Sequence, residues 1–290
     1  MRAEDVAERI WPGRGARLEA LGGGITNENF LVDVDGEKLV LRIGGRDTEL
    51  LGIDRDVEHA TSLIAAEAGV GPEVVAFVEP EGYLVTRFIE GDPIPAEEMK
   101  TPERVEAITS LLHRIHDGRS IPGRFDSFSV VKDYCRIASE HGVEMPPAYP
   151  WAQETADAVA ARRGPQPAYP CHNDLLNANF IDDGGAIRVV DWEYAGMGDR
   201  FFDLANLSVN HEFNPQDDDA LLRGYFGAPT AEQRVAHTLM RFMSDFREAM
   251  WGVVQQGISK IDFDFAAYAD EHFERLERTA ASPRFRAALG

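Results

Sequence analysis

The stretch "CHNDLLNANF", residues 171–180, gathers one histidine, one aspartate and three asparagines between two apolar segments. The stretch "GGAIRVVDWEYAG", residues 184–196, contains a short apolar run that reads as a buried strand. Together they predict a β-hairpin of residues 178–182 and 186–190, which turns at Asp183-Gly184-Gly185. The short polar groups therefore collect at one end of a two-stranded ribbon.

This hairpin predicts a site built from oxygen atoms. It brings Asn179 and Asp191 near the same end of the strand pair and leaves Asp174 in the loop before it. An Asn oxygen and an Asp carboxylate suit a divalent cation, and a further carboxylate is free to accept a proton. With His172, the order is H-x-D-x-x-x-x-N followed by D, which kinases use. An asparagine-rich turn with side-chain caps explains a few of these residues but not the full order and spacing.

The first 90 residues predict a small antiparallel sheet with one helix. Alternating apolar residues and turn residues place the helix from about residue 57 to Gly69 and five strands near 17–22, 29–34, 38–43, 74–78 and 83–88. The segment "EGDPIP", residues 90–95, breaks this pattern and reads as a hinge. We therefore expect an N-terminal domain of residues 1–90 and a second domain of residues 91–290.

Beyond the hinge the sequence turns mostly helical. One helix is capped by Thr101 and begins at Pro102, with apolar residues recurring on one face. His113 and His116 are three apart on this helix, but no third metal ligand has suitable spacing. The fold class we expect is α+β, with a small sheet lobe and a larger helical lobe.

Composition and net charge limit where we expect the protein to be and which partners we expect it to bind. No run of about 18 apolar residues exists to cross a bilayer, and the N-terminus lacks a secretory signal pattern, so we expect a cytoplasmic protein. The net charge of −21 argues against nucleic acid and anionic membranes as partners. Cys135 and Cys171 form no CxxC pair and are expected to be reduced, with Cys171 a small apolar residue rather than a nucleophile. The oligomeric state stays open.

Two stretches carry a resemblance to a known family. The segments "HNDLLNAN", residues 172–179, and "VVDWEYAGMGDRFFDLAN", residues 189–206, resemble the choline and ethanolamine kinase branch of the protein-kinase-like small-molecule phosphotransferases, which also contains aminoglycoside phosphotransferases. The similarity covers nearly the whole chain and implies a bilobal protein-kinase-like fold. In that branch the metal-binding motif reads D-[FW]-E-Y-A, matched by residues 191–195. The resemblance makes Glu193 a further Mg²⁺ ligand or a carboxylate that tunes the site, and makes Asp203 a buttress of the catalytic loop.

The resemblance also implies a nucleotide site in the N-terminal half. The segment "GGGITNENF", residues 22–30, resembles the loop that covers the phosphates of ATP, which assigns Gly24, Thr26 and Asn27 to the nucleotide. In "YLVTRFIEG" the backbone from Thr86 to Phe88 would meet adenine.

An arginine replaces the usual kinase lysine in this resemblance. It puts Arg42 of "LVLRIGG" on the phosphates of ATP, with Glu58 of the following helix as its ion-pair partner. A solvent-facing strand residue is the alternative for Arg42. Since the chain has only four lysines, an anionic substrate will mostly be held by arginine, Mg²⁺ or backbone N–H groups.

The acceptor site is implied by "MSDFREAMWGVVQQGISKIDFDFAAYADEHF", residues 243–273. Trp251 and Tyr268 match the aromatic residues that surround a quaternary ammonium in choline kinases, and Tyr194 is a third candidate. Ring faces attract such a cation by about 0.5–2 kcal/mol per contact. A place in the helix core is the alternative for Trp251 and Tyr268.

The cage implied by the resemblance is only partial. Glu248 stands where eukaryotic members have a second Trp, and Asn210 stands where they have an acidic residue. Glu248 and nearby Glu212 would still offer negative charge to a cation. The resemblance thus implies an ATP- and Mg²⁺-dependent kinase for the hydroxyl of a small amino alcohol, with choline favoured. Ethanolamine, thiamine, a sugar or an aminoglycoside are alternatives, as is a binding module without turnover.

Overall fold

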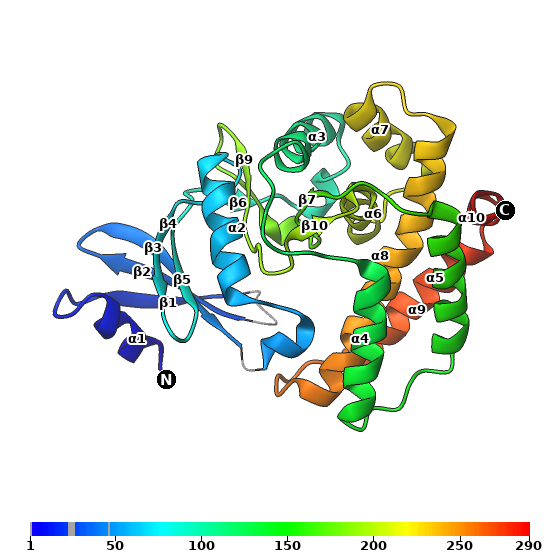
Figure 1. Ribbon diagram of the computed structural model, residues 1–290. Coiled ribbons are helices and arrows are strands. Elements are labelled where there is room, and N and C mark those ends of the chain that lie inside the picture. Colours follow the sequence, from blue (N-terminus) through cyan, green and yellow to red (C-terminus); the bar gives the residue numbers. More distant parts are fainter. Residues whose placement is uncertain (1, 23–26, 46) are drawn as a thin grey trace.

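The computed structural model describes residues 2–22, 27–45 and 47–290. A small antiparallel sheet with two helices forms one part of the molecule, and the helices from α3 onward form the larger part (Figure 1). The expected α+β class with a bilobal, protein-kinase-like arrangement is confirmed.

The N-terminal part is a five-stranded antiparallel sheet in the order β1-β2-β3-β5-β4. Its strands are β1 Arg17–Leu21, β2 Asn27–Val34, β3 Glu37–Gly44, β4 Val74–Val78 and β5 Tyr83–Arg87. Val34 faces Glu37 across the Asp35-Gly36 turn, where both turn residues have positive φ, as the short hairpin connection requires. Alternate residues of β2 and β3 pack against helix α1, Ala3–Ile10, and form a small core.

Helix α2, Arg55–Glu67, follows the sheet's third strand and lies between the sheet and the helical part (Figure 1). Asp54 caps it by accepting hydrogen bonds from the backbone N–H groups of Asp56 and Val57. The apolar side chains of this region, Leu51, Ile53, Ala65 and Val70, belong to the large core of the helical part rather than to the core of the sheet.

The segment expected to act as a simple breaker contains a strand. Asp92–Pro93, β6, pairs antiparallel with β8 of the predicted hairpin, Phe180–Asp182, in a three-stranded sheet with β9, Ile187–Val189. A Cβ on Gly91 would lie 2.3 Å from the carbonyl oxygen of Asp182, so only glycine permits this close approach. Sequence periodicity misses β6 because two residues are too few to show alternation.

The C-terminal part consists of helices α3 Pro102–His116, α4 Ser127–Glu140, α5 Tyr149–Arg163, α6 Arg200–Asn210, α7 Pro215–Phe226, α8 Ala231–Ile258, α9 Phe265–Ala281 and α10 Pro283–Leu289. Helix α8 is buried around most of its circumference from residue 236 to residue 255. A long helix with this burial is the central element of the lobe, against which α4, α6 and α9 pack. No helix within the described part of the chain is both long and apolar enough to span a membrane.

Short strands hold the polar stretch in place. The predicted hairpin is present as β8 and β9, with Phe180 opposite Val189 and a turn at residues 183–186. A second pair joins β7, Tyr169–Cys171, to β10, Gly196–Gly198. This pair brackets the site from both sides in sequence, since β7 leads into it and β10 leaves it.

Candidate active site

The end of the hairpin brings Asn179 and Asp191 together as the sequence predicts. The backbone N–H of Val190 donates to the carbonyl of Asn179 at 2.9 Å, which fixes the two residues at the same end of the ribbon. Asp191 has a φ of 70°, a left-handed conformation that is costly for a residue with a side chain and that typically persists at functional sites. Its Oδ1 atom is buried and has no hydrogen-bond partner among the residues that the structure describes.

Asp174 lies against this end through Asn179. The Asn179 amide nitrogen donates to the Asp174 carbonyl at 2.9 Å and lies 3.4 Å from its Oδ2 atom. Because the amide nitrogen is used in this way, the Oδ1 atom of Asn179 is the one left to coordinate a cation. The geometry therefore unites Asp174, Asn179 and Asp191, although they come from a loop and two different strand ends.

His172 supports the loop rather than taking part in proton transfer. Its Nδ1 accepts from the Asp174 backbone N–H at 3.3 Å, and its Nε2 lies 3.0 Å from the carbonyl of Val190. These partners require a neutral ring that carries its proton on Nε2. Burial lowers the pKa of His172, which favours the same neutral form. Burial likewise raises the pKa of Asp174 to about 7, with Glu248 and Asp191 adding to the effect and Arg247 opposing it.

Asp203 of α6 anchors the backbone of the loop. Its carboxylate is fully buried and accepts from the backbone N–H groups of His172 at 2.9 Å and Asn173 at 2.7 Å. His116 Nε2 approaches the same carboxylate at 3.0 Å, and His116 Nδ1 lies 2.7 Å from the Tyr225 hydroxyl. The placement fits the buttress role that the resemblance implies.

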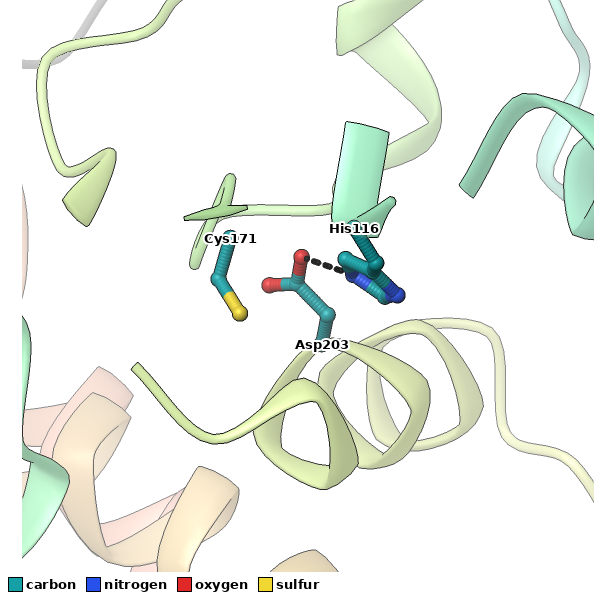
Figure 2. A group of neighbouring side chains, drawn as sticks. All are labelled: His116, Cys171 and Asp203. Atoms are coloured by element: carbon teal, nitrogen blue, oxygen red, sulfur yellow. Dashed lines mark hydrogen bonds and ion pairs between the residues drawn. The ribbon is translucent and has the colours of Figure 1, made fainter. Parts of the chain in front are cut away.

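Figure 2 shows His116, Cys171 and Asp203 facing one another. One possible ligand atom of each residue lies within 4.8 Å of those of the other two. We do not assign a metal to this cluster, because both nitrogens of His116 and both carboxylate oxygens of Asp203 already have protein partners. Burial raises the pKa of the Cys171 thiol well above its usual range, which is the behaviour of an inert core cysteine. His113 instead bonds the carbonyl of Tyr225 at 2.7 Å, so it forms no metal pair with His116.

Arg42 of β3 reaches the end of the hairpin that carries Asp191. Its guanidinium forms ion pairs with Glu58 at 2.5 Å and with Asp191 at 2.6 Å. Burial lowers the pKa of Arg42, but the three nearby carboxylates, led by Asp191, outweigh this effect and raise it. The solvent-facing alternative for Arg42 is therefore wrong, since only 12% of its side chain is exposed.

A second arginine, Arg55 at the start of α2, completes this ion-pair network. It bonds Glu58 at 2.6 Å and Glu193 at 3.1 Å, and its other nitrogen donates to the Asn27 side chain at 2.9 Å. Asn27 in turn donates to Glu193 at 2.8 Å. Sequence reasoning missed Arg55, and its only signal is its place one helical turn before Glu58.

The same ion-pair network fixes the positions of the Glu193 and Asn27 side chains. One Glu193 oxygen is shared by Asn27 and Arg55, and the side chain is 3% exposed. Burial and the neighbouring Asp191 carboxylate raise the pKa of Glu193. Its role as a metal ligand stays a prediction. Gly24 and Thr26, predicted to cover the phosphates, lie outside the described residues.

The predicted adenine-binding segment ends β5. Thr86 pairs with Val40 of β3, and the backbone N–H of Phe88 donates to the Lys38 carbonyl at 3.1 Å. The N–H of Arg87 donates to the carbonyl of Glu73 at 2.8 Å. The segment is thus the junction of three strands with the connection to the helical part, and its contact with a nucleotide stays a prediction.

The predicted acceptor residues form one cluster. Trp251 Nε1 donates to the Tyr194 hydroxyl at 3.0 Å, and the Tyr268 hydroxyl donates to Glu248 at 2.9 Å. The Trp251 and Tyr268 rings meet edge to face, with centroids 5.5 Å apart. Arg247, which sequence reasoning missed, lies 3.6 Å from Asp174 and 3.1 Å from Glu248 and so links this cluster to the catalytic loop.

Asn210, which departs from the family pattern, and the nearby Glu212 lie differently. Asn210 donates to the carbonyl of Leu175 at 3.4 Å and to Asn206 at 3.2 Å, so it supports the loop that carries Asp174. Glu212 is exposed just beyond the end of α6.

A small antiparallel sheet over a helical lobe, with an Asp, an Asn and a second Asp converging near their junction, defines the class of protein-kinase-like phosphotransferases. Comparisons with known proteins narrow this class. Residues 17–237 match the model of the phosphotransferase enzyme family. The chain belongs to this family.

Relatives within the family agree with the sequence resemblance. A choline/ethanolamine kinase family protein of Mesorhizobium loti superimposes with a TM-score of 0.84 at 33% identity, covering 99% of this chain and 97% of that one. Ethanolamine kinase 2 of Rattus norvegicus is 27% identical over 91% of this chain and 76% of its own length. Protein LicA of Haemophilus influenzae is 24% identical over 88% of this chain and 78% of its own length. The predicted kinship with choline and ethanolamine kinases is confirmed.

Replacing Asp203 should destabilise the loop that carries Asp174. Asp203→Ala leaves the backbone N–H groups of His172 and Asn173 buried without acceptors. Since each such donor costs about 1–3 kcal/mol, we expect the free energy of unfolding to fall by about 2–6 kcal/mol in urea denaturation. Cys171→Ala is the matched control, because it alters the same cluster without removing a hydrogen-bond acceptor of the loop. Equal losses in the two variants would contradict the anchoring role.

Proposed function

We propose that this protein is an ATP- and Mg²⁺-dependent kinase that phosphorylates the hydroxyl of a small amino alcohol, with choline as the first candidate. The observation that carries the proposal is the convergence of Asp174, Asn179 and Asp191 at one end of the hairpin. In this proposal residues 1–90 form the nucleotide-binding lobe and residues 91–290 the catalytic and substrate-binding lobe.

The residues present fit a magnesium ion. Asp191 offers a buried oxygen that no group in the described part of the chain satisfies, and Asn179, at the same end of the hairpin, offers an amide oxygen. Both are hard oxygen ligands, the type that Mg²⁺ prefers. Glu193 is a candidate for a further ligand or a tuning carboxylate. When bound, the ion would neutralise charge on the phosphates of the nucleotide.

Arg42 is suited to hold the nucleotide phosphates. Glu58 holds its guanidinium on one side, and Asp191, which we assign to the metal, pairs with it on the other side. A guanidinium also provides several directed N–H donors for phosphate oxygens. Asn27 belongs to the segment assigned to the phosphate-covering loop, residues 22–30, and the backbone from Thr86 to Phe88 is the proposed contact for adenine.

Asp174 is suited to orient the acceptor hydroxyl. It would accept the hydroxyl proton, or hold the hydroxyl in line with the γ-phosphate, as the oxygen attacks. The loop that carries it is fixed by Asp203, His172 and Asn179, so its position is set before a substrate arrives. Positioning and charge neutralisation supply most of the rate in this kind of reaction.

The acceptor cluster supports an amino alcohol. Tyr268 bonds the Glu248 carboxylate, Trp251 packs on Tyr268 and bonds Tyr194, and a cation is attracted both by aromatic rings and by a carboxylate. Choline would use the rings. Ethanolamine is the second candidate, because a primary ammonium can donate hydrogen bonds to Glu248 and a quaternary one cannot.

Release of ADP with choline, ethanolamine, thiamine and kanamycin as separate acceptors tests the function. We expect turnover with choline or ethanolamine and none above the acceptor-free rate with the other two. Turnover confined to thiamine or kanamycin would support another small-molecule kinase. A protein that binds ATP but phosphorylates none of the four would support the binding module.

Asp174→Asn should remove turnover without removing nucleotide binding. Loss of a positioned proton acceptor typically costs about 10²–10⁴-fold in kcat, and we expect a fall of that size. Titration calorimetry should still detect ATP, because Asp174 is not assigned to the nucleotide. Asp126→Asn, which changes the exposed capping residue of α4, is the control. A variant at position 174 with near-normal kcat would refute the assignment.

Asp191→Ala should abolish the part of nucleotide binding that depends on magnesium. The substitution removes the buried oxygen that we assign to the ion. Calorimetry with ATP in the presence of Mg²⁺ and in the presence of a chelator should therefore give the same weak affinity. The wild-type protein should bind more tightly with Mg²⁺. An undiminished magnesium effect in the variant would place the metal elsewhere.

A further inference from the structure

Arg247 of α8 is the largest side chain in the described structure with almost no contact with solvent, its side chain being 2% exposed. It contacts two segments that are far from α8 in sequence, as well as the neighbouring Glu248. One nitrogen donates to the carbonyl of Asn173, and the guanidinium lies 3.6 Å from Asp174 and 3.1 Å from Glu248. Its central carbon stands 5.2 Å from the centre of the Tyr194 ring.

A buried guanidinium needs compensating charge, because taking it out of water is costly. Asp174 and Glu248 supply that charge here, and the ring of Tyr194 adds a face that attracts a cation. When Asp174 and Glu248 are both ionised, two carboxylates against one guanidinium leave one negative charge. That balance suits an acceptor with a single positive charge and gives Arg247 a place in the acceptor site rather than in the core alone.

We propose that Arg247 is a positioning residue that clamps the catalytic loop to the acceptor-binding helix. The inference rests on the proposed function of Asp174 and Glu248 and adds to it the group that joins them. Arg247 acts through these neighbours and transfers no proton itself.

The clamp acts on a strained residue. Asn173 has a φ of 67°, a left-handed conformation that an ordinary residue seldom adopts. Its backbone N–H is held by Asp203 at 2.7 Å, its side chain donates to the carbonyl of Tyr194 at 3.0 Å, and its own carbonyl is held by Arg247. This carbonyl belongs to the peptide that leads into Asp174. Releasing it would let that peptide rotate and move the carboxylate, and a displacement of about 1 Å can cost about 100-fold in rate.

Three variants separate positioning from simple structural support. Arg247→Met leaves Asp174 and Glu248 buried without a cation, and we expect a lower Tm. Arg247→Met combined with Glu248→Gln removes one of these carboxylates, and we expect it to regain most of the lost Tm. The double variant should nevertheless keep a kcat at least about tenfold below that of Glu248→Gln alone, because the contact with the Asn173 carbonyl is still missing. The KM for ATP should stay within about twofold of the wild-type value in all variants, since none of the residues assigned to the nucleotide is changed.

Arg241→Met is the matched control on the same helix. Arg241 also pairs with a carboxylate, Asp218 at 2.7 Å, and donates to a backbone carbonyl, that of Phe213 at 3.2 Å. We expect it to lower the Tm without lowering kcat. Arg247→Lys keeps the charge but lacks the planar fork, and we expect stability closer to wild type with kcat still reduced about tenfold.

Recovery of kcat together with Tm in the double variant would overturn the proposal, because the role of Arg247 would then be structural only. Hydrogen exchange of residues 172–176 provides a readout that needs no acceptor. We expect faster exchange there in the double variant despite its recovered Tm, and unchanged exchange would also overturn the proposal. If the wild-type protein phosphorylates no amino alcohol, the proposed function fails, while the exchange measurement still decides whether Arg247 clamps the loop.

Discussion

The Asp203 carboxylate is the contact on which the rest of the site depends. It accepts two consecutive backbone N–H groups, those of His172 and Asn173, from a loop that has no regular secondary structure to satisfy them. His116 bonds the carboxylate and Tyr225 bonds His116, so α3, α6 and α7 together fix the loop. The proposed catalytic groups can then be positioned by a few hydrogen bonds to this loop instead of by a large packed surface.

A second constraint lies at the junction with the sheet. Arg42 and Arg55 alternate with Glu58, Glu193 and Asp191 in a network from which solvent is largely excluded. Such a network is stable only when each charge has its partners, and this requirement fixes β3, α2 and the segment after β9 relative to one another. Asn27 extends the same network to the start of β2.

The elements with clear periodicity could be predicted from the sequence. The five strands of the sheet, helix α2 and the hairpin around residue 184 lie within two residues of their expected positions, because apolar alternation and turn residues mark them directly. The two-residue strand β6 and the pair β7–β10 were not predicted, since pairing partners distant in sequence decide them. Local pattern carries no information on such pairing.

The residues of the candidate site likewise divide into those that the sequence predicts and those that it does not. Asp174, Asn179 and Asp191 were predicted because their spacing is itself the signal, and the aromatic cluster followed from the family resemblance. Arg55 and Arg247 were missed because an arginine in an amphipathic helix ordinarily reads as a solvated residue. Only the packing of α8 on all sides turns Arg247 inward.

The two apolar cores divide the molecule at a different place from the chain boundary near residue 90. The sheet and α1 share one core, whereas Ala65 of α2 and apolar residues on either side of this helix are packed into the other. The boundary between the two cores therefore runs between the sheet and α2 and not through the connection after β5. The ion pair of Arg42 on β3 with Glu58 on α2 crosses this boundary, so a buried charge pair joins the two cores.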